Sequence, residues 1–276
     1  MNLASLFEQT HNLPNIPKVV QELIATFNSD EFDMEEIAQK ISMDPVLTAK
    51  VLRLANSAHY GASRTVASAS DASVLLGFST LRTLVLASGI TGAVNTPEGF
   101  DRKQFWLDNF AIAAIAKWLA PYCKQDREAA FTCGMLSSIG EMLIQLLLPS
   151  EAKKIQSAVE AGGKLYEVED AMLGYTYADV GAELASRWKF PANIASGIKY
   201  HMDPALAGEN EKLAGLIHLS VYIYSCQQQK LSDQETLNDF PKDIAEKIGM
   251  DTDTALADLA KEDGIESGME SLLFDL

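Results

Sequence analysis

The sequence predicts an all-α protein, and three observations carry this prediction. Apolar residues recur with the helical period of about 3.6 residues in almost every patterned segment, for example over residues 16–27. No segment shows the strict alternation of apolar and polar residues that is typical of a half-buried strand. Hydrophobic residues make up 47% of the 276 residues, which excludes a disordered chain and is enough for a large core.

The first part of the chain is predicted to contain five helices, and two short motifs mark their ends. Asp44 and Pro45 form a start signal, because an Asp side chain can cap free backbone N–H groups and proline fits the first helical position. Gly77 marks the junction between two apolar helices. The predicted helices cover residues 16–27, 34–43, 45–57, 67–76 and 78–90.

A loop-like stretch over residues 93–103 has Asn, Thr, Pro and Gly close together and predicts a boundary between two lobes. We therefore expect one helical lobe over residues 1–95 and a second over residues 96–230. A helix over residues 128–148 is apolar nearly all round and is predicted to be the central buried helix of the second lobe. The other helices predicted in this lobe cover residues 104–120, 151–160, 177–188 and 212–227, with one more beginning at Pro191.

Residues 231–276 form an acidic tail that is expected to be partly helical. They carry 13 Asp and Glu against 3 Lys and Arg, in a chain whose net charge is −16. Such a segment can be a solvated covering helix or a segment that binds a partner. The acidic balance argues against nucleic acid and against an anionic membrane surface as partners.

Other features of the composition predict a reducing compartment, with the cytoplasm as the expected location. The cysteines form no C-x-x-C motif, and their odd number favours free thiols over a disulfide framework. The N-terminal residues lack the basic and apolar regions of a signal peptide. No uncharged apolar run reaches the roughly 18 residues needed to span a membrane.

No motif predicts a catalytic residue, a metal site or a cofactor. The sequence Gly162-Gly163-Lys164 lacks the first glycine of a phosphate-binding loop, and no G-x-S-x-G, H-E-x-x-H or zinc-spaced Cys/His set occurs. A di-metal hydrolase collects several His and Asp ligands at close quarters, whereas the histidines here are scattered. They are His11, His59, His201 and His218.

Two adjacent serines, Ser137 and Ser138, are unusual because they lie within the apolar run 131–149. Small hydroxyl residues in a buried helix can bond back to backbone carbonyls and let another helix pack closely. A ridge of small residues on the predicted helix over 177–188 would likewise let a neighbouring helix approach. Close packing is therefore one interpretation of the serines.

Several short motifs occur in a specific order along residues 12–225. In the first lobe they are Leu13-Pro14, Ile16-Pro17, Asp44-Pro45, Leu52-Arg53-Leu54-Ala55-Asn56-Ser57 and Leu76-Gly77. In the second lobe they are Phe105-Trp106, GMLSSIG over 134–140, VGAELASRW over 180–188, Phe190-Pro191 and His201. Their order and spacing resemble the HDOD family, the HD-related output domain of bacterial signalling proteins.

The resemblance implies an all-α, two-lobe fold related to the HD-domain phosphohydrolases, which hold metals with His and Asp ligands. It implies that the positions of that metal site fall on Asp108, Ser137, Ser138, Tyr177, Tyr200 and His201. The two serines replace the His-Asp pair, and only the second residue of a later double histidine remains. Hydroxyl groups are poor metal ligands unless ionised. We therefore expect a degenerate HD pocket with no metal and no catalysis.

Three functions stay open on the sequence. The first is a non-catalytic regulatory module that binds signalling proteins, with Arg53 and Asn56 as candidate interaction residues. These two residues could equally be structural, with Asn56 ending its helix and Arg53 pairing with a local acid. The alternative is a metal-dependent phosphohydrolase of the HD superfamily acting on a nucleotide or cyclic dinucleotide. The third is a pocket that binds a nucleotide without cleaving it, with Tyr177 and Tyr200 stacking on the base. Neither the partner nor the oligomeric state can be predicted.

Overall fold

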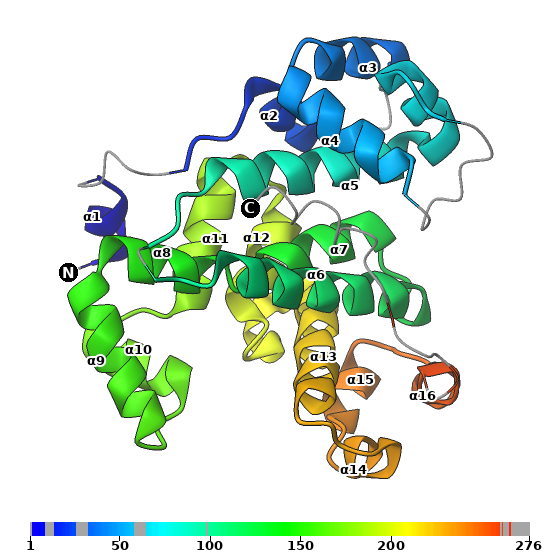
Figure 1. Ribbon diagram of the computed structural model, residues 1–276. Helices are drawn as coiled ribbons and strands as arrows, with labels where there is room; N and C mark the ends of the chain where they lie inside the picture. Colours follow the sequence, from blue (N-terminus) through cyan, green and yellow to red (C-terminus); the bar gives the residue numbers. More distant parts are fainter. Residues whose placement is uncertain are drawn as a thin grey trace.

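The computed structural model describes residues 2–8, 14–25, 33–57, 65–97, 99–259, 261 and 265. The regular elements of these residues are helices, and no strand occurs among them (Figure 1). The predicted all-α class is therefore confirmed. His11, His59, Leu13 of the Leu13-Pro14 motif and most of the acidic tail beyond residue 259 lie outside the described residues.

The first lobe is built from four helices, which lie at the top of Figure 1. They are α2 (Lys18–Ala25), α3 (Met34–Ser42), α4 (Pro45–Ala55) and α5 (Ala69–Ala93). The start signal is confirmed, because the Asp44 side chain accepts hydrogen bonds from the backbone nitrogens of Val46 and Leu47, both at 3.0 Å. The junction at Gly77 is also confirmed: its backbone has φ 72° and ψ 165° and divides α5 into two helical halves.

The second lobe contains eight longer helices among the described residues. They are α6 (Arg102–Leu119), α7 (Arg127–Leu136), α8 (Ile139–Leu147), α9 (Pro149–Glu160), α10 (Leu165–Leu173), α11 (Tyr177–Arg187), α12 (Ala192–Tyr200) and α13 (Glu211–Gln228). The prediction of one helix over 128–148 was wrong, because the chain turns at Ser137 and Ser138 between α7 and α8. Helix α10 was not predicted.

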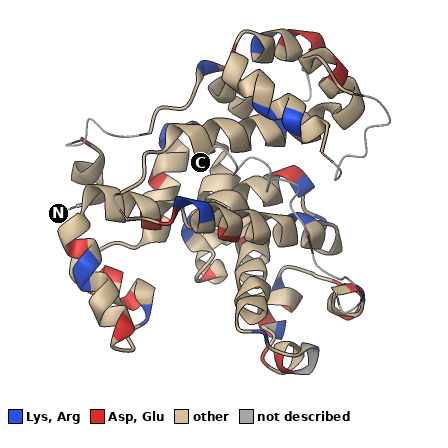
Figure 2. Cartoon of the chain, in the orientation of Figure 1, with Lys and Arg blue, Asp and Glu red and all other residues tan. Residues whose placement is uncertain are grey.

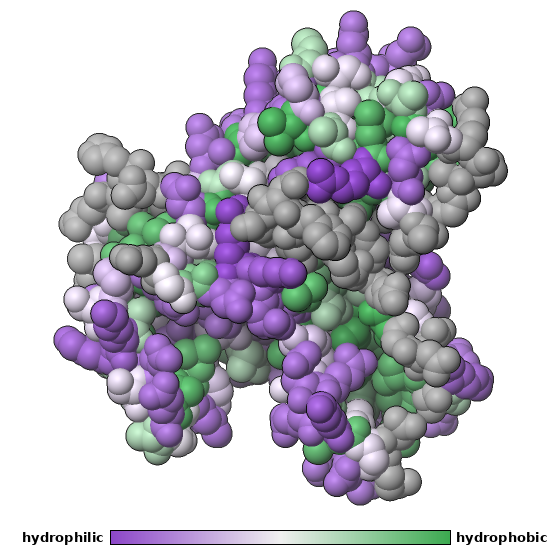
Figure 3. Space-filling view, in the orientation of Figure 1, coloured by the Kyte–Doolittle hydropathy of each residue, from purple (hydrophilic) through white to green (hydrophobic). Residues whose placement is uncertain are grey.

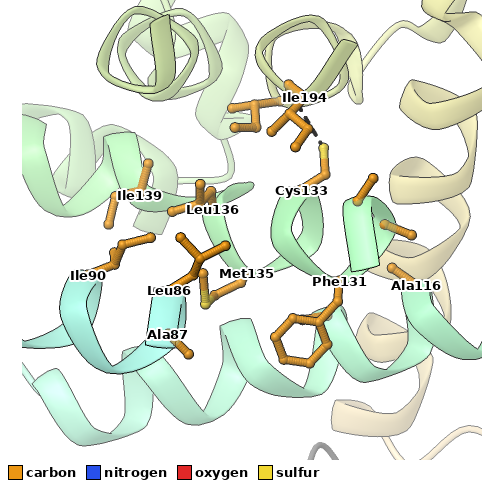
Figure 4. Packing of buried hydrophobic residues seen from close by; sticks show 14 of the residues in the cluster. Leu86, Ala87, Ile90, Ala116, Phe131, Cys133, Met135, Leu136, Ile139 and Ile194 are labelled. Atoms are coloured by element: carbon orange, nitrogen blue, oxygen red, sulfur yellow. Dashed lines mark hydrogen bonds between the residues drawn. The ribbon is translucent and has the colours of Figure 1, made fainter. Parts of the chain in front are cut away.

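The second half of α5 joins the two lobes through a continuous apolar core. Residues 81–91 of this half are all buried. Figure 4 shows Leu86 and Ile90 of α5 beside Leu136 of α7 and Ile139 of α8, and these side chains are at most 1% exposed. The interface therefore resembles the interior of one domain more than a contact between separate domains.

A buried carboxylate adds a polar connection across the same interface. Glu128, at the start of α7, forms an ion pair with Lys117 of α6 over 2.7 Å. The Thr83 hydroxyl of α5 donates to the other oxygen of this carboxylate. Because an unpaired buried carboxylate is costly, these contacts favour one arrangement of α5 against α6 and α7.

The N-terminal helix α1 (Leu3–Glu8) packs against the second lobe. The Arg187 guanidinium at the end of α11 lies 4.7 Å from the centre of the Phe7 ring. The Trp188 indole N–H donates to the Pro14 carbonyl oxygen over 3.1 Å. The N-terminal residues therefore cross from the second lobe to the first, and the boundary near residue 95 stays a prediction.

The acidic tail is part of the fold as far as residue 259. It forms α14 (Asp233–Asn238), α15 (Lys242–Lys247) and α16 (Thr252–Leu259). The Ile248 side chain packs so closely on Gly215 of α13 that an added Cβ there would lie 2.5 Å from it. The Tyr122 hydroxyl donates to Asp258 over 3.0 Å. Figure 2 shows Asp and Glu positions in red along these helices.

Two stretches, Ala69–Ala93 and Arg127–Leu147, are long and apolar enough to cross a membrane by length and composition. In the fold, 61% of the most apolar 18-residue segment of the first stretch is buried, and 72% of that of the second. Gly77 interrupts the first stretch and the turn between α7 and α8 interrupts the second. We therefore interpret both as core helices of a globular fold.

Candidate functional site

The turn between α7 and α8 carries Ser137 and Ser138, the two serines that the family resemblance predicts at the positions of the His-Asp pair. The buried Ser137 hydroxyl donates to the Gly134 carbonyl oxygen over 2.8 Å. The Ser138 hydroxyl donates to Asn109 Oδ1 on α6 over 2.7 Å, and the Asn109 amide donates to the Phe105 carbonyl over 2.8 Å. Both serine hydroxyls are therefore engaged inside the protein.

Helix α8 packs very closely on α11 beside this turn. A Cβ added at Gly140 would lie 1.9 Å from the Tyr177 carbonyl oxygen and 2.9 Å from the Gly181 backbone nitrogen. Only glycine at position 140 permits this approach, which confirms the predicted close packing against the small-residue ridge of α11. The approach leaves little space between the two helices for an added ligand.

Tyr177 and His201 form a buried pair at the start of α11 and the end of α12. Their ring centres are 5.7 Å apart, and 3.0 Å separates the Tyr177 hydroxyl from His201 Nε2. His201 Nδ1 lies 2.7 Å from the Ile198 carbonyl oxygen, which can only accept, so Nδ1 carries the proton. Nε2 then accepts from the tyrosine hydroxyl.

The electrostatics of this pair favour neutral side chains. Burial lowers the pKa of His201 to about 4, so the imidazole is neutral at pH 7. Burial also raises the pKa of Tyr177, and the nearby Glu141 and Glu169 raise it further. The tyrosine therefore keeps its proton at pH 7 and donates it to His201 Nε2.

The two other predicted residues of the HD pocket make their contacts elsewhere. Asp108 Oδ1 accepts from the Tyr224 hydroxyl over 2.5 Å and from the Gln104 amide over 2.6 Å. The Lys199 ammonium lies 5.2 Å from the centre of the Tyr200 ring. The structure thus pairs Tyr177 with His201 and links Ser138 to Asn109, whereas Asp108 and Tyr200 have separate partners.

The residues at these positions do not fit a metal ion. Within the described part of the chain, no group of three or more His, Cys, Asp or Glu side chains is placed to hold one. His201 uses both ring nitrogens in contacts with Tyr177 and Ile198. A metal would have to displace these partners and the hydrogen bonds of both serines.

Two carboxylates, those of Glu169 and Glu141, lie beside the site but are not among the residues that the family resemblance implies. Glu169 of α10 is only 2% exposed, and its Oε2 accepts from the Tyr177 backbone N–H over 2.7 Å. Burial raises the pKa of Glu169 to about 7, and that of Glu141 to about 7 with smaller contributions from the charges of Glu169 and Asp108. Both line a cavity of about 620 Å³ between α8, α9 and α10.

The sequence alone assigns no role to Glu141 or to Glu169. No motif in the sequence marks Glu169, because its role depends on the unpredicted helix α10 reaching the start of α11. The apolar residues of the α10 segment do not recur with a clear helical period, so the sequence does not indicate that Glu169 is buried in a helix. The cavity is lined by neither Tyr177 nor Tyr200, so the tyrosines do not form a stacking site there.

The candidate interaction residues lie at the end of α4 in the first lobe. The Asn56 amide donates to the Leu52 and Val66 carbonyls over 2.7 and 2.8 Å, and its oxygen accepts from the Val66 N–H over 2.8 Å. Asn56 therefore ties the end of α4 to the segment before α5. Arg53 is exposed in the last turn of α4. Their role in binding a partner stays a prediction.

Comparisons with known structures place this fold among solved proteins of the same kind. The chain is 38% identical, with a TM-score of 0.83 and 98% of both chains covered, to a Shewanella amazonensis protein called "Putative phosphohydrolase". An HDOD domain protein from Geobacter sulfurreducens is 22% identical, with a TM-score of 0.80 over 98% of this chain and 95% of that one. The latter likeness shows the fold alone.

A sequence relative and a family model then show to which family the chain belongs. An uncharacterized protein of Treponema pallidum is 26% identical over 212 residues, which are 76% of this chain and 41% of that protein. The chain therefore spans less than half of the length of this relative. The model of the HDOD domain matches residues 13–204, well over half of the sequence. The chain belongs to the HDOD domain family.

Proposed function

We propose that this chain is a non-catalytic signal-transduction module that acts by binding other proteins. The observation that carries the proposal is the closed set of hydrogen bonds at the HD positions. Both nitrogens of His201 and both serine hydroxyls have partners within the protein, so no free ligand set faces a substrate. Described side chains that are not placed to hold a metal, and that include no activated nucleophile, are poorly suited to attack a phosphoester.

The surface of the first lobe supports the protein-binding part of the proposal. Val74, Met43 and Val46 are 83%, 72% and 67% exposed, the highest values among the large hydrophobic side chains of the described residues. All three belong to the lobe formed by α2–α5, and Figure 3 shows hydrophobic surface on this lobe at the top of the view. Exposed apolar side chains that gather into one patch are typical of surfaces that bind other proteins.

The net charge of the chain supports a protein as the partner, and its cysteines support a cytoplasmic location. The net charge of −16 disfavours nucleic acid, which requires a basic face. Cys123, Cys133 and Cys226 are free and buried, as expected for a protein in a reducing compartment.

Metal content separates this proposal from the alternative, a metal-dependent phosphohydrolase of the HD superfamily. The purified chain is incubated with Mn, Fe, Ni and Zn salts, desalted and submitted to elemental analysis, and hydrolysis of bis(p-nitrophenyl) phosphate is followed in parallel. We expect substoichiometric metal and no hydrolysis above the metal-free background. One bound metal per chain together with metal-dependent hydrolysis would overturn the proposal and favour the phosphohydrolase.

Partner binding is tested with the exposed apolar residues of the first lobe. The immobilised chain captures proteins from its source cells, and the double variant Met43→Asp/Val74→Asp is compared with the single variant Leu206→Asp. Leu206 is 66% exposed on the second lobe and serves as the matched control. We expect the double variant alone to lose a specifically captured protein. Equal capture by all three folded proteins would exclude this surface.

A further inference from the structure

A cavity of about 620 Å³ lies beside the degenerate site and has the size of a small-molecule pocket. Helices α8, α9 and α10 and the loop before α6 form its walls. Its apolar lining comes from Phe100, Ile144, Ile155, Val159 and Leu165. This combination of apolar walls and a few polar groups is typical of sites for small organic ligands.

The polar groups of the cavity are mainly carboxylates. Glu169 is 2% exposed, and only its Oε2 has a hydrogen-bond partner among the described residues, the Tyr177 N–H. The Glu141 carboxylate has neither a hydrogen bond nor an ion pair within the described part of the chain. Because a carboxylate that is buried or half-buried without a full set of partners is costly, a cation placed between Glu141 and Glu169 would be stabilised by both.

Among the described residues, no basic side chain forms an ion pair with Glu141 or Glu169. The one basic side chain in the lining, Lys153, is exposed and forms no ion pair with another described residue. The other two acids in the lining already have partners: Asp101 caps α6 through the Gln104 N–H at 2.9 Å, and Glu160 accepts from the Gln156 amide at 3.0 Å. Burial, with repulsion from Glu169 and Asp108, raises the pKa of Glu141 to about 7, so a nearby cation would stabilise its charged form.

We propose that this cavity binds a small organic ammonium ion that carries an apolar body. The cationic group lies against the carboxylates of Glu141 and Glu169, and the apolar body contacts the walls formed by α8 and α9. A metal ion fits less well, because no described group of three or more ligating side chains is present and the walls are apolar. This site is independent of the proposed protein partner.

Binding is measured by isothermal titration calorimetry at pH 8 with n-hexylammonium as the probe. Hexan-1-ol has the same apolar body without the charge, and hexanoate carries the opposite charge. We expect hexylammonium to bind at one site per chain. Hexan-1-ol is expected to bind about tenfold or more weakly, since a hydrogen bond to a charged group typically contributes about 1.5–3 kcal/mol. Hexanoate is not expected to bind.

Glu141→Gln and Glu169→Gln each remove one negative charge from the cavity. Gln at position 169 can still accept a hydrogen bond from the Tyr177 N–H. The folding of each variant is checked by circular dichroism. We expect each variant to weaken hexylammonium binding about tenfold. Asp170→Asn is the control, because Asp170 is exposed on the same helix and does not line the cavity.

Three results would overturn the proposal. The first is that the wild-type chain binds hexylammonium no more strongly than hexan-1-ol. This test does not depend on the folding of any variant. The second is unchanged affinity in both Gln variants. The third is an equal loss in Asp170→Asn, which would indicate non-specific attraction to the acidic surface.

Discussion

Replacement of Gly140 by alanine is expected to destabilise this fold strongly. Gly140 lies in α8 against the start of α11, where an added Cβ would be 1.9 Å from the Tyr177 carbonyl oxygen. It would also lie 2.9 Å from the Gly181 backbone nitrogen. Both atoms belong to the main chain of α11, so a change of side-chain rotamer cannot relieve the contact.

The size of the effect follows from this distance. Ordinary van der Waals contact begins near 3.4 Å, so α8 and α11 must separate by about 1.5 Å at this point, in an interior that is close-packed. Overpacking a core typically costs about 1–3 kcal/mol, and alanine regains at most about 1 kcal/mol of helix propensity relative to glycine. Because the obstacle is backbone, we expect a net loss of about 2 kcal/mol in the free energy of unfolding.

The assay is urea unfolding followed by circular dichroism at the helical minimum. Gly92→Ala is the control, because Gly92 is in α5 and the nearest atom to an added Cβ is Lys50 Nζ at 3.8 Å. The control should be unchanged or more stable by up to about 1 kcal/mol. A Gly140→Ala protein within about 0.5 kcal/mol of the wild type would refute the close approach of α8 and α11.

Three other substitutions test the site and the first lobe. Tyr177→Phe leaves His201 Nε2 buried without a donor and should lower the free energy of unfolding by about 1–3 kcal/mol, whereas the exposed Tyr166→Phe should change it little in the same urea titration. Glu169→Gln should become more stable than the wild type as pH rises from 5 to 8, by about 1–3 kcal/mol at pH 8. The sign follows because burial raises the pKa of Glu169 to about 7 in the folded state, so the wild type loses stability as pH rises through that value and Glu169 loses its proton. A stability difference between variant and wild type that stays constant with pH in parallel melts would contradict this prediction. Asn56→Ala removes three hydrogen bonds to the backbone and should lower the melting temperature without loss of partner capture, if Asn56 is structural.

Local signals in the sequence predicted most of the helices because those signals act over one or two turns. Asp44 followed by Pro45 caps a helix through its own neighbours, and Gly77 breaks one through its own backbone. The division of the predicted helix over 128–148 has no such signal, since the run is apolar on both sides of the serines. Helix α10 was not predicted because it is only nine residues long and its polar and apolar residues show no clear helical period.

The candidate site was only partly predictable for a related reason. Resemblance to the family placed Tyr177 and His201 at corresponding positions, and the structure joins them by a hydrogen bond. Glu169 depends on a contact between a side chain on α10 and a backbone N–H at the start of α11, which no local pattern encodes. The separation of Asp108 from this pair likewise depends on its contact with Tyr224, which is distant in the sequence.

The same contacts explain why restoring one metal ligand would not restore a metal site. A histidine at position 137 would have to fit where Ser137 is 1% exposed. Even then, His201 would keep its hydrogen bond to Tyr177, so replacement of that tyrosine would also be needed. The approach of α8 to α11 at Gly140 would still limit the space between the helices. Several coupled changes are therefore required, because the described residues at these positions form one hydrogen-bonded packing arrangement, and Glu141 and Glu169 face the neighbouring cavity.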